Sequence, residues 1–132
     1  MVREAEFQAG LLKALRMAGC VAFNNVQNAR TGSGRPDIEF SYRGRMVFAE
    51  LKVEPNKPTS RQVYTALALH QKGIDCLFMA IDDNAIVSVC NAERVDYHYF
   101  TGRGFRKSAD KTQMLESVKS FFNVLNSIRI EW

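Results

Sequence analysis

"GRPDIEF", residues 34–40, and "VFAELKV", residues 47–53, each have the composition of a half-buried β-strand that is interrupted by charge. An Arg-Gly pair between them suits a tight turn, so the stretch predicts a β-hairpin. Three charged side chains, Asp37, Glu50 and Lys52, stand inside the predicted strands, where a core favours apolar residues. These charges are the first candidates for a functional site.

Amphipathic patterns predict helices on both sides of this hairpin. Residues 3–18 carry Phe7, Leu11 and Leu15 at three- and four-residue steps, and Gly19 follows as a stop signal. The other expected elements are a short strand at 20–26, a helix at 59–73, strands at 75–81 and 85–90, and a C-terminal helix at 111–125. The order αβββαββ plus a C-terminal helix indicates an α/β fold with a central mixed β-sheet flanked by helices.

The bulk composition describes one ordinary globular domain, expected to span residues 1–132. Its net charge of +4 permits a polyanionic partner without requiring one. The cysteines, Cys20, Cys76 and Cys90, lie far apart in apolar stretches, so buried free thiols are favoured over zinc ligands or disulfides. No run resembles a signal peptide or a membrane span, and we expect a cytoplasmic protein without a membrane partner.

The charges of the hairpin are expected to meet in space. Alternation along a strand places Glu50 and Lys52 on one face of the sheet, and closure of the hairpin brings Asp37 opposite Glu50. Two carboxylates directed at one another repel unless a cation or a shared proton lies between them. A hard cation such as Mg²⁺ binds one or two carboxylates, and a nearby lysine can orient an attacking water. The alternative is that these charges face solvent, with Phe48 exposed beside them.

The first helix contributes one further acid. At about 100 degrees per residue, Glu4 projects at the centre of the apolar stripe, whereas Glu6 points about 160 degrees away. We therefore expect Glu4 to face the sheet and Glu6 to face water. A frayed, solvated Glu4 at the helix end is the alternative interpretation.

Taken together, these residues resemble the PD-(D/E)xK nuclease superfamily, and most closely its virus-type replication-repair nuclease (VRR-NUC) family. The shared elements are Glu4 with Gln8 on a helix, "GRPD" at 34–37, "ELK" at 50–52 and "TSRQ" at 59–62. The order of these elements is that of the family, although Leu51 replaces the more usual valine and the C-terminal third has no counterpart. The resemblance implies a restriction-endonuclease-like core.

The resemblance also implies a metal-dependent deoxyribonuclease, either an endonuclease or an exonuclease. The implied ligands of Mg²⁺ or Mn²⁺ are Asp37, Glu50, the backbone carbonyl of Leu51 and, through water, Glu4. Lys52 would position or activate the nucleophilic water. Gln62 would support the site from the second helix, where it also forms the S/T-x-x-Q capping box with Thr59.

Basic side chains supply the expected DNA contacts. Those expected to border the site and to contact phosphates are Arg30, Arg35, Arg43, Arg45, Lys57 and Arg61. Residues 94–111, which include "GRGFRKSADK", show no clear pattern, and a solvated loop is favoured there over a second basic strip or a mobile arm. Nothing resembles a base-reading module, so recognition of DNA shape is favoured over recognition of sequence.

The leading hypothesis is therefore a structure-selective DNA endonuclease that acts on flaps, branches or junctions in replication, repair or recombination. We expect a homodimer, because a chain of 132 residues offers little surface to a branched substrate. The rival is a nuclease-fold module that binds DNA without cutting it, and the presence of all four polar site residues argues against it. A restriction-type or junction-resolving enzyme would carry the same site, and the sequence does not separate these substrates.

Overall fold

The computed structural model describes residues 2–25 and 35–128. Within them six strands form one sheet in the order β1-β2-β3-β4-β5-β6, and every neighbouring pair is antiparallel except β3 with β4. The elements are α1 (Glu4–Met17), β1 (Ala22–Asn24), β2 (Ile38–Tyr42), β3 (Arg45–Val53), α2 (Ser60–Gln71), β4 (Cys76–Ile81), β5 (Ile86–Cys90), β6 (His98–Thr101), a short 3₁₀ helix η1 (Arg103–Phe105) and α3 (Lys111–Ser127). The expected α/β architecture with a central mixed sheet is confirmed.

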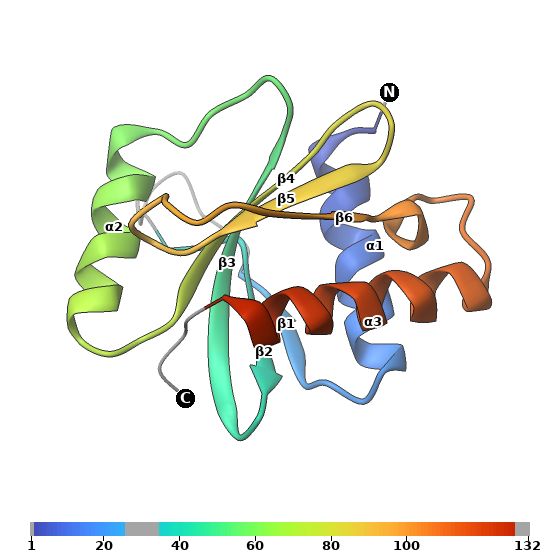
Figure 1. The fold of residues 1–132 in the computed structure, drawn as a ribbon, viewed down its shortest axis with the longest axis horizontal. Coiled ribbons are helices and arrows are strands. Elements are labelled where there is room, and N and C mark those ends of the chain that lie inside the picture. The colour runs from blue at the N-terminus through green and yellow to red at the C-terminus, as the bar shows by residue number, and fades with distance from the viewer. Residues whose placement is uncertain (1, 26–34, 129–132) are drawn as a thin grey trace.

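The helices divide between the two faces of the sheet. Figure 1 shows α1 and α3 together on one side of the strands and α2 on the other. The face toward α1 and α3 carries the main core, in which Phe40, Leu51, Phe7 and Phe121 have no exposed area. No helix within the described residues is long and apolar enough to cross a membrane.

The predicted hairpin fixes the position of the charged residues. Arg43 and Gly44 both have positive φ, 51° and 76°, as the tight turns that match the twist of a hairpin require. The ladder between β2 and β3 runs back from this turn to the pair Ile38↔Ala49. One step further in the same register, Asp37 stands opposite Glu50.

The connection from β3 through α2 to β4 determines which edge of the sheet can hold a site. β3 and β4 are parallel, so their carboxyl ends lie at the same edge of the sheet. α2 begins with the predicted capping box, in which the backbone N–H of Gln62 donates to the Thr59 hydroxyl. Gly73 ends the helix with φ of 77°, as expected for a left-handed C-cap. The N-terminus of α2 therefore stands near the carboxyl end of β3.

The segment after β5 departs from the sequence prediction. Within residues 94–111 the chain forms β6 and η1, neither of which was assigned from the sequence. A side chain at Gly10 would lie 2.0 Å from the Phe105 carbonyl oxygen, and one at Gly104 would lie 2.2 Å from that of Gln113. This segment is therefore clamped between α1 and α3 at a backbone spacing that only glycine allows.

Polar contacts complete the docking of this segment. The Ser117 hydroxyl accepts from the Gly104 N–H at 2.8 Å, and the Lys107 N–H donates to Glu6 at 2.9 Å. Arg106 donates to the Asp83 carbonyl at 2.8 Å. The favoured interpretation of a solvated loop is therefore wrong, because Phe105 is buried in the main core and anchors the segment.

Candidate functional site

Asp37 and Glu50 meet where β2 begins and β3 approaches its end. The Asp37 carboxylate accepts a hydrogen bond of 2.9 Å from the backbone N–H of Leu51, which lies beyond the last pair of the β2 ladder. The Glu50 side chain hydrogen-bonds Asp37 directly, and Glu50 is only 2% exposed. The hairpin thus directs the two acids at one another, as the strand register predicted, with Glu50 buried and Asp37 half-buried.

The electrostatics of this pair favour a bound proton. Burial raises the pKa of Glu50 to about 9, and the hydrogen bond and negative charge of Asp37 act in the same direction. The Lys52 ammonium lowers this pKa, and Glu4 raises it further. At neutral pH Glu50 therefore keeps its proton, and an additional positive charge beside it would favour the ionised form.

Gln62 connects the acid pair to the start of α2. Its side-chain amide donates to Glu50 Oε1 at 3.0 Å, and its side-chain oxygen accepts from the Thr59 N–H at 2.8 Å. One side chain therefore closes the capping box and holds the Glu50 carboxyl. Gln62 thus makes the capping contact and the contact with Glu50 together, and its part in catalysis stays a prediction.

Glu4 and Glu6 on α1 are both partly buried, although we expected Glu6 to face water. Glu4 is half-buried and lies close enough to Glu50 for its charge to raise the pKa of that residue. Glu6 is also half-buried, because it accepts the hydrogen bond from the Lys107 N–H. The prediction that Glu6 simply faces water is wrong, since the docked segment after β6 covers it.

The donor set at the end of β3 fits a hard divalent cation. Asp37 and Glu50 supply two carboxylates, and the N–H and C=O of a strand residue point to the same edge, so the Leu51 carbonyl lies on the Asp37 side. Mg²⁺ commonly binds through one or two carboxylates and keeps several waters. Among the residues that the structure describes, no three Asp, Glu, His or Cys side chains gather into a metal cluster. A site of this kind would thus rely on two carboxylates, with Glu4 in reach only through water.

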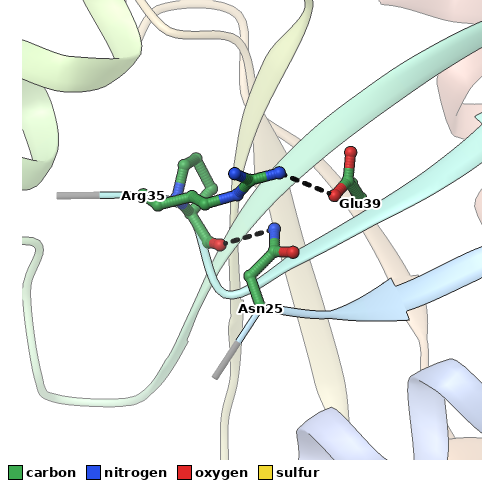
Figure 2. Close-up of polar contacts among 4 residues, drawn as sticks. Asn25, Arg35 and Glu39 are labelled. Carbon is green, nitrogen blue, oxygen red and sulfur yellow. Dashed lines mark hydrogen bonds and ion pairs between the residues drawn. The ribbon is translucent and has the colours of Figure 1, made fainter. Parts of the chain in front are cut away.

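The backbone on either side of Asp37 is held in place. Figure 2 shows Asn25 beside the chain that enters β2, where its side-chain amide donates to the Pro36 carbonyl at 3.1 Å. The Asn25 N–H also donates to the Asp37 carbonyl at 2.8 Å. Arg35 reaches Glu39 at 3.0 Å (Figure 2), and its guanidinium stands over the Phe48 ring. This clamp positions the Asp37 side chain, although sequence reasoning gave no part to Asn25.

Three of the basic residues expected to contact DNA lie near the acid pair. Arg35 comes just before Asp37, Lys57 lies in the loop between β3 and α2, and Arg61 is exposed on the first turn of α2. Lys57 is paired with Glu54 at 3.4 Å, yet its side chain remains 72% exposed. These three cations lie on segments that adjoin the acid pair, and their contact with DNA stays a prediction.

Two others do not border the site. Arg43 and Arg45 lie at the hairpin turn, and Arg45 is five strand positions, or about 17 Å, from Glu50. Arg45 faces Asp75 at 3.7 Å and contacts the Gly73 carbonyl. Their expected place beside the acid pair is wrong, because a hairpin puts its turn at the opposite end from its open strand ends. Arg30 lies outside the described residues.

Comparison with known proteins identifies the fold. No family model and no curated protein matches the chain. Among solved structures, Hjc, a Holliday junction resolvase from the archaeal hyperthermophile Archaeoglobus fulgidus, matches with a TM-score of 0.56 and 14% sequence identity. The match covers 76% of this chain and 90% of that one. The sheet and its flanking helices therefore form the restriction-endonuclease-like fold that the sequence resemblance implied.

Proposed function

We propose that this chain is a metal-dependent DNA endonuclease of the PD-(D/E)xK class, closest to the VRR-NUC family. The observation that carries the proposal is the buried contact between Asp37 and Glu50, with Lys52 on the same strand face. Such a contact between two acids costs stability unless a proton or a cation offsets it. The fold shared with a junction resolvase supports the same conclusion.

Mg²⁺ or Mn²⁺ would be held by Asp37, Glu50 and the Leu51 carbonyl, with Glu4 joining through water. When bound, the ion would lower the pKa of a water and polarise the phosphate. Gln62 holds Glu50 Oε1, which fixes the orientation of that carboxyl. The Leu51 N–H likewise fixes the Asp37 carboxyl. Both acids are thus oriented by the chain itself.

Lys52 contributes the positive charge that hydrolysis requires. Its ammonium orients the attacking water and stabilises the negative charge that develops on the phosphate oxygens. The water oxygen forms a bond to phosphorus and gives up a proton to solvent, and the bond to one ester oxygen breaks as that oxygen takes a proton from solvent. The products are one phosphate end and one hydroxyl end.

The substrate proposed is branched or flapped DNA. Arg35, Lys57 and Arg61 border the site and suit phosphates, which they can bind without reading sequence. A homodimer and a cytoplasmic location, both expected from the sequence, belong to the same proposal. A role in replication, repair or recombination follows from that substrate class.

Cleavage of a labelled substrate panel tests the proposal. Single-stranded, duplex, flap, splayed-arm and four-way-junction DNA are incubated with Mg²⁺ or Mn²⁺, and wild-type protein is compared with Lys52→Ala. We expect metal-dependent cutting that Lys52→Ala abolishes. Lys72→Ala, which removes an exposed lysine at the other end of α2, is the matched control and should cut normally. Equal cutting by wild type and Lys52→Ala would contradict the assigned site.

The same panel decides the alternative, a nuclease-fold module that binds DNA and cuts nothing. Binding is measured by gel shift without metal, for wild type and Lys52→Ala. Undiminished binding with no cutting of any substrate by the wild-type protein would favour that module. In that case Asp37, Glu50 and Lys52 would serve DNA binding or stability alone.

A further inference from the structure

A small cavity opens beside Lys52 on the face of the sheet that α2 partly covers. It measures about 120 Å³ and lies between the loop before α2 and the loop after β5. Phe78 and Cys90, paired across β4 and β5, form part of its floor, and the next pair on this face, Ala80 and Ser88, extends it. Lys52 thus belongs both to the proposed hydrolytic site and to the lining of the cavity.

The rim of the cavity is positively charged. Three cations, Lys52, Lys57 and Arg94, line it, and the acid in the same lining is Glu54. Lys57 contacts Glu54 but stays largely exposed, and Arg94 is exposed as well. Such a rim can bind phosphates on either side of a group that enters the cavity.

Tyr97 forms an aromatic wall of the cavity. Tyr97 lines the cavity beside Cys90, and 49% of the residue stays exposed. Burial raises the pKa of the Cys90 thiol and Tyr97 lowers it, so the phenol end lies close to the floor. A fixed, accessible aromatic ring beside cations is the combination with which proteins bind single-stranded DNA, because bases stack on the ring and cations hold the backbone.

The size of the cavity limits what can enter. One water occupies about 30 Å³ in the liquid, so the space corresponds to about four waters. Drug-sized ligands require about 300 to 1,000 Å³. The cavity therefore suits one flat ring, and it is too small for a base pair.

We propose that this cavity is a subsite for one unpaired nucleobase next to the scissile phosphate. The base stacks on Tyr97, and its flanking phosphates lie against Lys57 and Arg94. The inference rests on the proposed nuclease function, because Lys52 would join the subsite to the reacting phosphate. A base within a duplex cannot enter, so the substrate class is DNA with an unpaired strand at the cut, such as a flap or a splayed arm.

Binding without cutting tests the subsite directly. A short single strand that carries a fluorescent aminopurine base is titrated with protein in EDTA, and quenching of its fluorescence reports stacking. Tyr97→Ala should weaken binding about tenfold and remove the quenching. Tyr97→Phe should retain both, because it keeps the ring. Tyr64→Ala, which removes a 74% exposed tyrosine on α2 outside the cavity lining, is the matched control.

A second variant tests whether Tyr97→Ala loses binding only because the loop that carries Tyr97 misfolds. Ala80→Leu fills the cavity from β4 and leaves Tyr97 in place. It should remove the quenching as Tyr97→Ala does, with an unchanged melting temperature. Wild-type quenching in both Tyr97→Ala and Ala80→Leu, or an equal loss in Tyr64→Ala, would overturn the subsite.

The outcomes separate the subsite from the nuclease. If Tyr97→Ala alone loses single-strand binding and the wild type cuts no DNA with any metal, the subsite stands and the hydrolytic function fails. If the wild type cuts with Mg²⁺ or Mn²⁺ and Tyr97→Ala cuts flaps and duplexes as well as the wild type does, the nuclease stands and the subsite fails.

Discussion

β3 contributes Ala49 and Leu51 to the face covered by α1 and α3, and it contributes Glu50 and Lys52 to the face covered by α2. Ala49 and Leu51 are completely buried among apolar neighbours. Glu50 is buried just as deeply, but its neighbours are another acid, an amide and a lysine. Alternate residues of one strand thus occupy opposite chemical environments.

The cover over the two faces differs in the same way. α3 buries six of its residues, against β6, η1 and α1, whereas α2 buries only Ala66. Thin cover leaves room for the cavity beside Lys52 and for access to the acid pair. The face covered by α1 and α3 therefore supplies most of the stability of the fold. This stability lets the face covered by α2 hold Glu50, whose burial as an acid opposes folding.

Glu50→Gln should give the largest effect and acts on the α2 face. We expect loss of metal-dependent cleavage, since the amide cannot supply a carboxylate ligand. The metal-free variant should be more stable than the wild type at neutral pH, because glutamine keeps the shape of the protonated acid and, unlike Glu50, has no proton to release on unfolding. Cleavage assays and thermal melts without metal measure the two effects. Glu93→Gln, at an exposed glutamate, is the control, and a cleaving Glu50→Gln protein would break the comparison.

Phe121→Ala acts on the opposite face and should show the reverse pattern. Phe121 is completely buried against Phe40 and Phe100, so the free energy of unfolding should fall by about 3 to 5 kcal/mol. Cleavage per folded molecule should not change. Denaturant unfolding measures the loss of free energy of unfolding. Leu115→Ala is the control, because Leu115 lies on the same helix and is 40% exposed. Similar losses in both variants would show that α3 does not carry the core.

The smallest effect is counted per pH unit: the free energy of unfolding of the metal-free protein should change by at most about 1.4 kcal/mol for each unit of pH. The pKa of Glu50 is about 9 when folded and near its ordinary 4.5 when unfolded. Between these values the folded chain keeps a proton that the unfolded chain releases, so the free energy of unfolding should fall as pH rises from about 4.5 to about 9. Unfolding curves across this range measure the slope. Glu50→Gln should be flatter, and identical slopes would contradict the burial of an acid on this face.

The sequence predicted the parts of the fold that depend on local pattern. Alternation in the hairpin and an Arg-Gly turn fix a register, and the register alone places Asp37 opposite Glu50. The capping box of Thr59 and Gln62 likewise needs only four neighbouring residues. In each case the information lies within a few residues, so it can be recognised without the rest of the chain.

What the sequence did not predict depends on distant contacts. Gly104 and Phe105 of η1 fit between α1 and α3, and α1 lies at the other end of the sequence. The same docking covers Glu6. The contact of Arg45 with Asp75 was likewise not predicted, because Asp75 follows only after the whole of α2. Charge and glycine content alone do not distinguish a docked segment from a solvated one.

Gln62 also makes the first turn of α2 sensitive to events at the acid pair. Any change that draws the Glu50 carboxyl away releases the Gln62 amide, and the same side chain secures the Thr59 N–H. Amide hydrogen exchange at Thr59 would then speed up or slow down with the state of a carboxyl on another element. The exchange rate of the Thr59 amide hydrogen would thus report whether a proton or a cation is bound between Asp37 and Glu50.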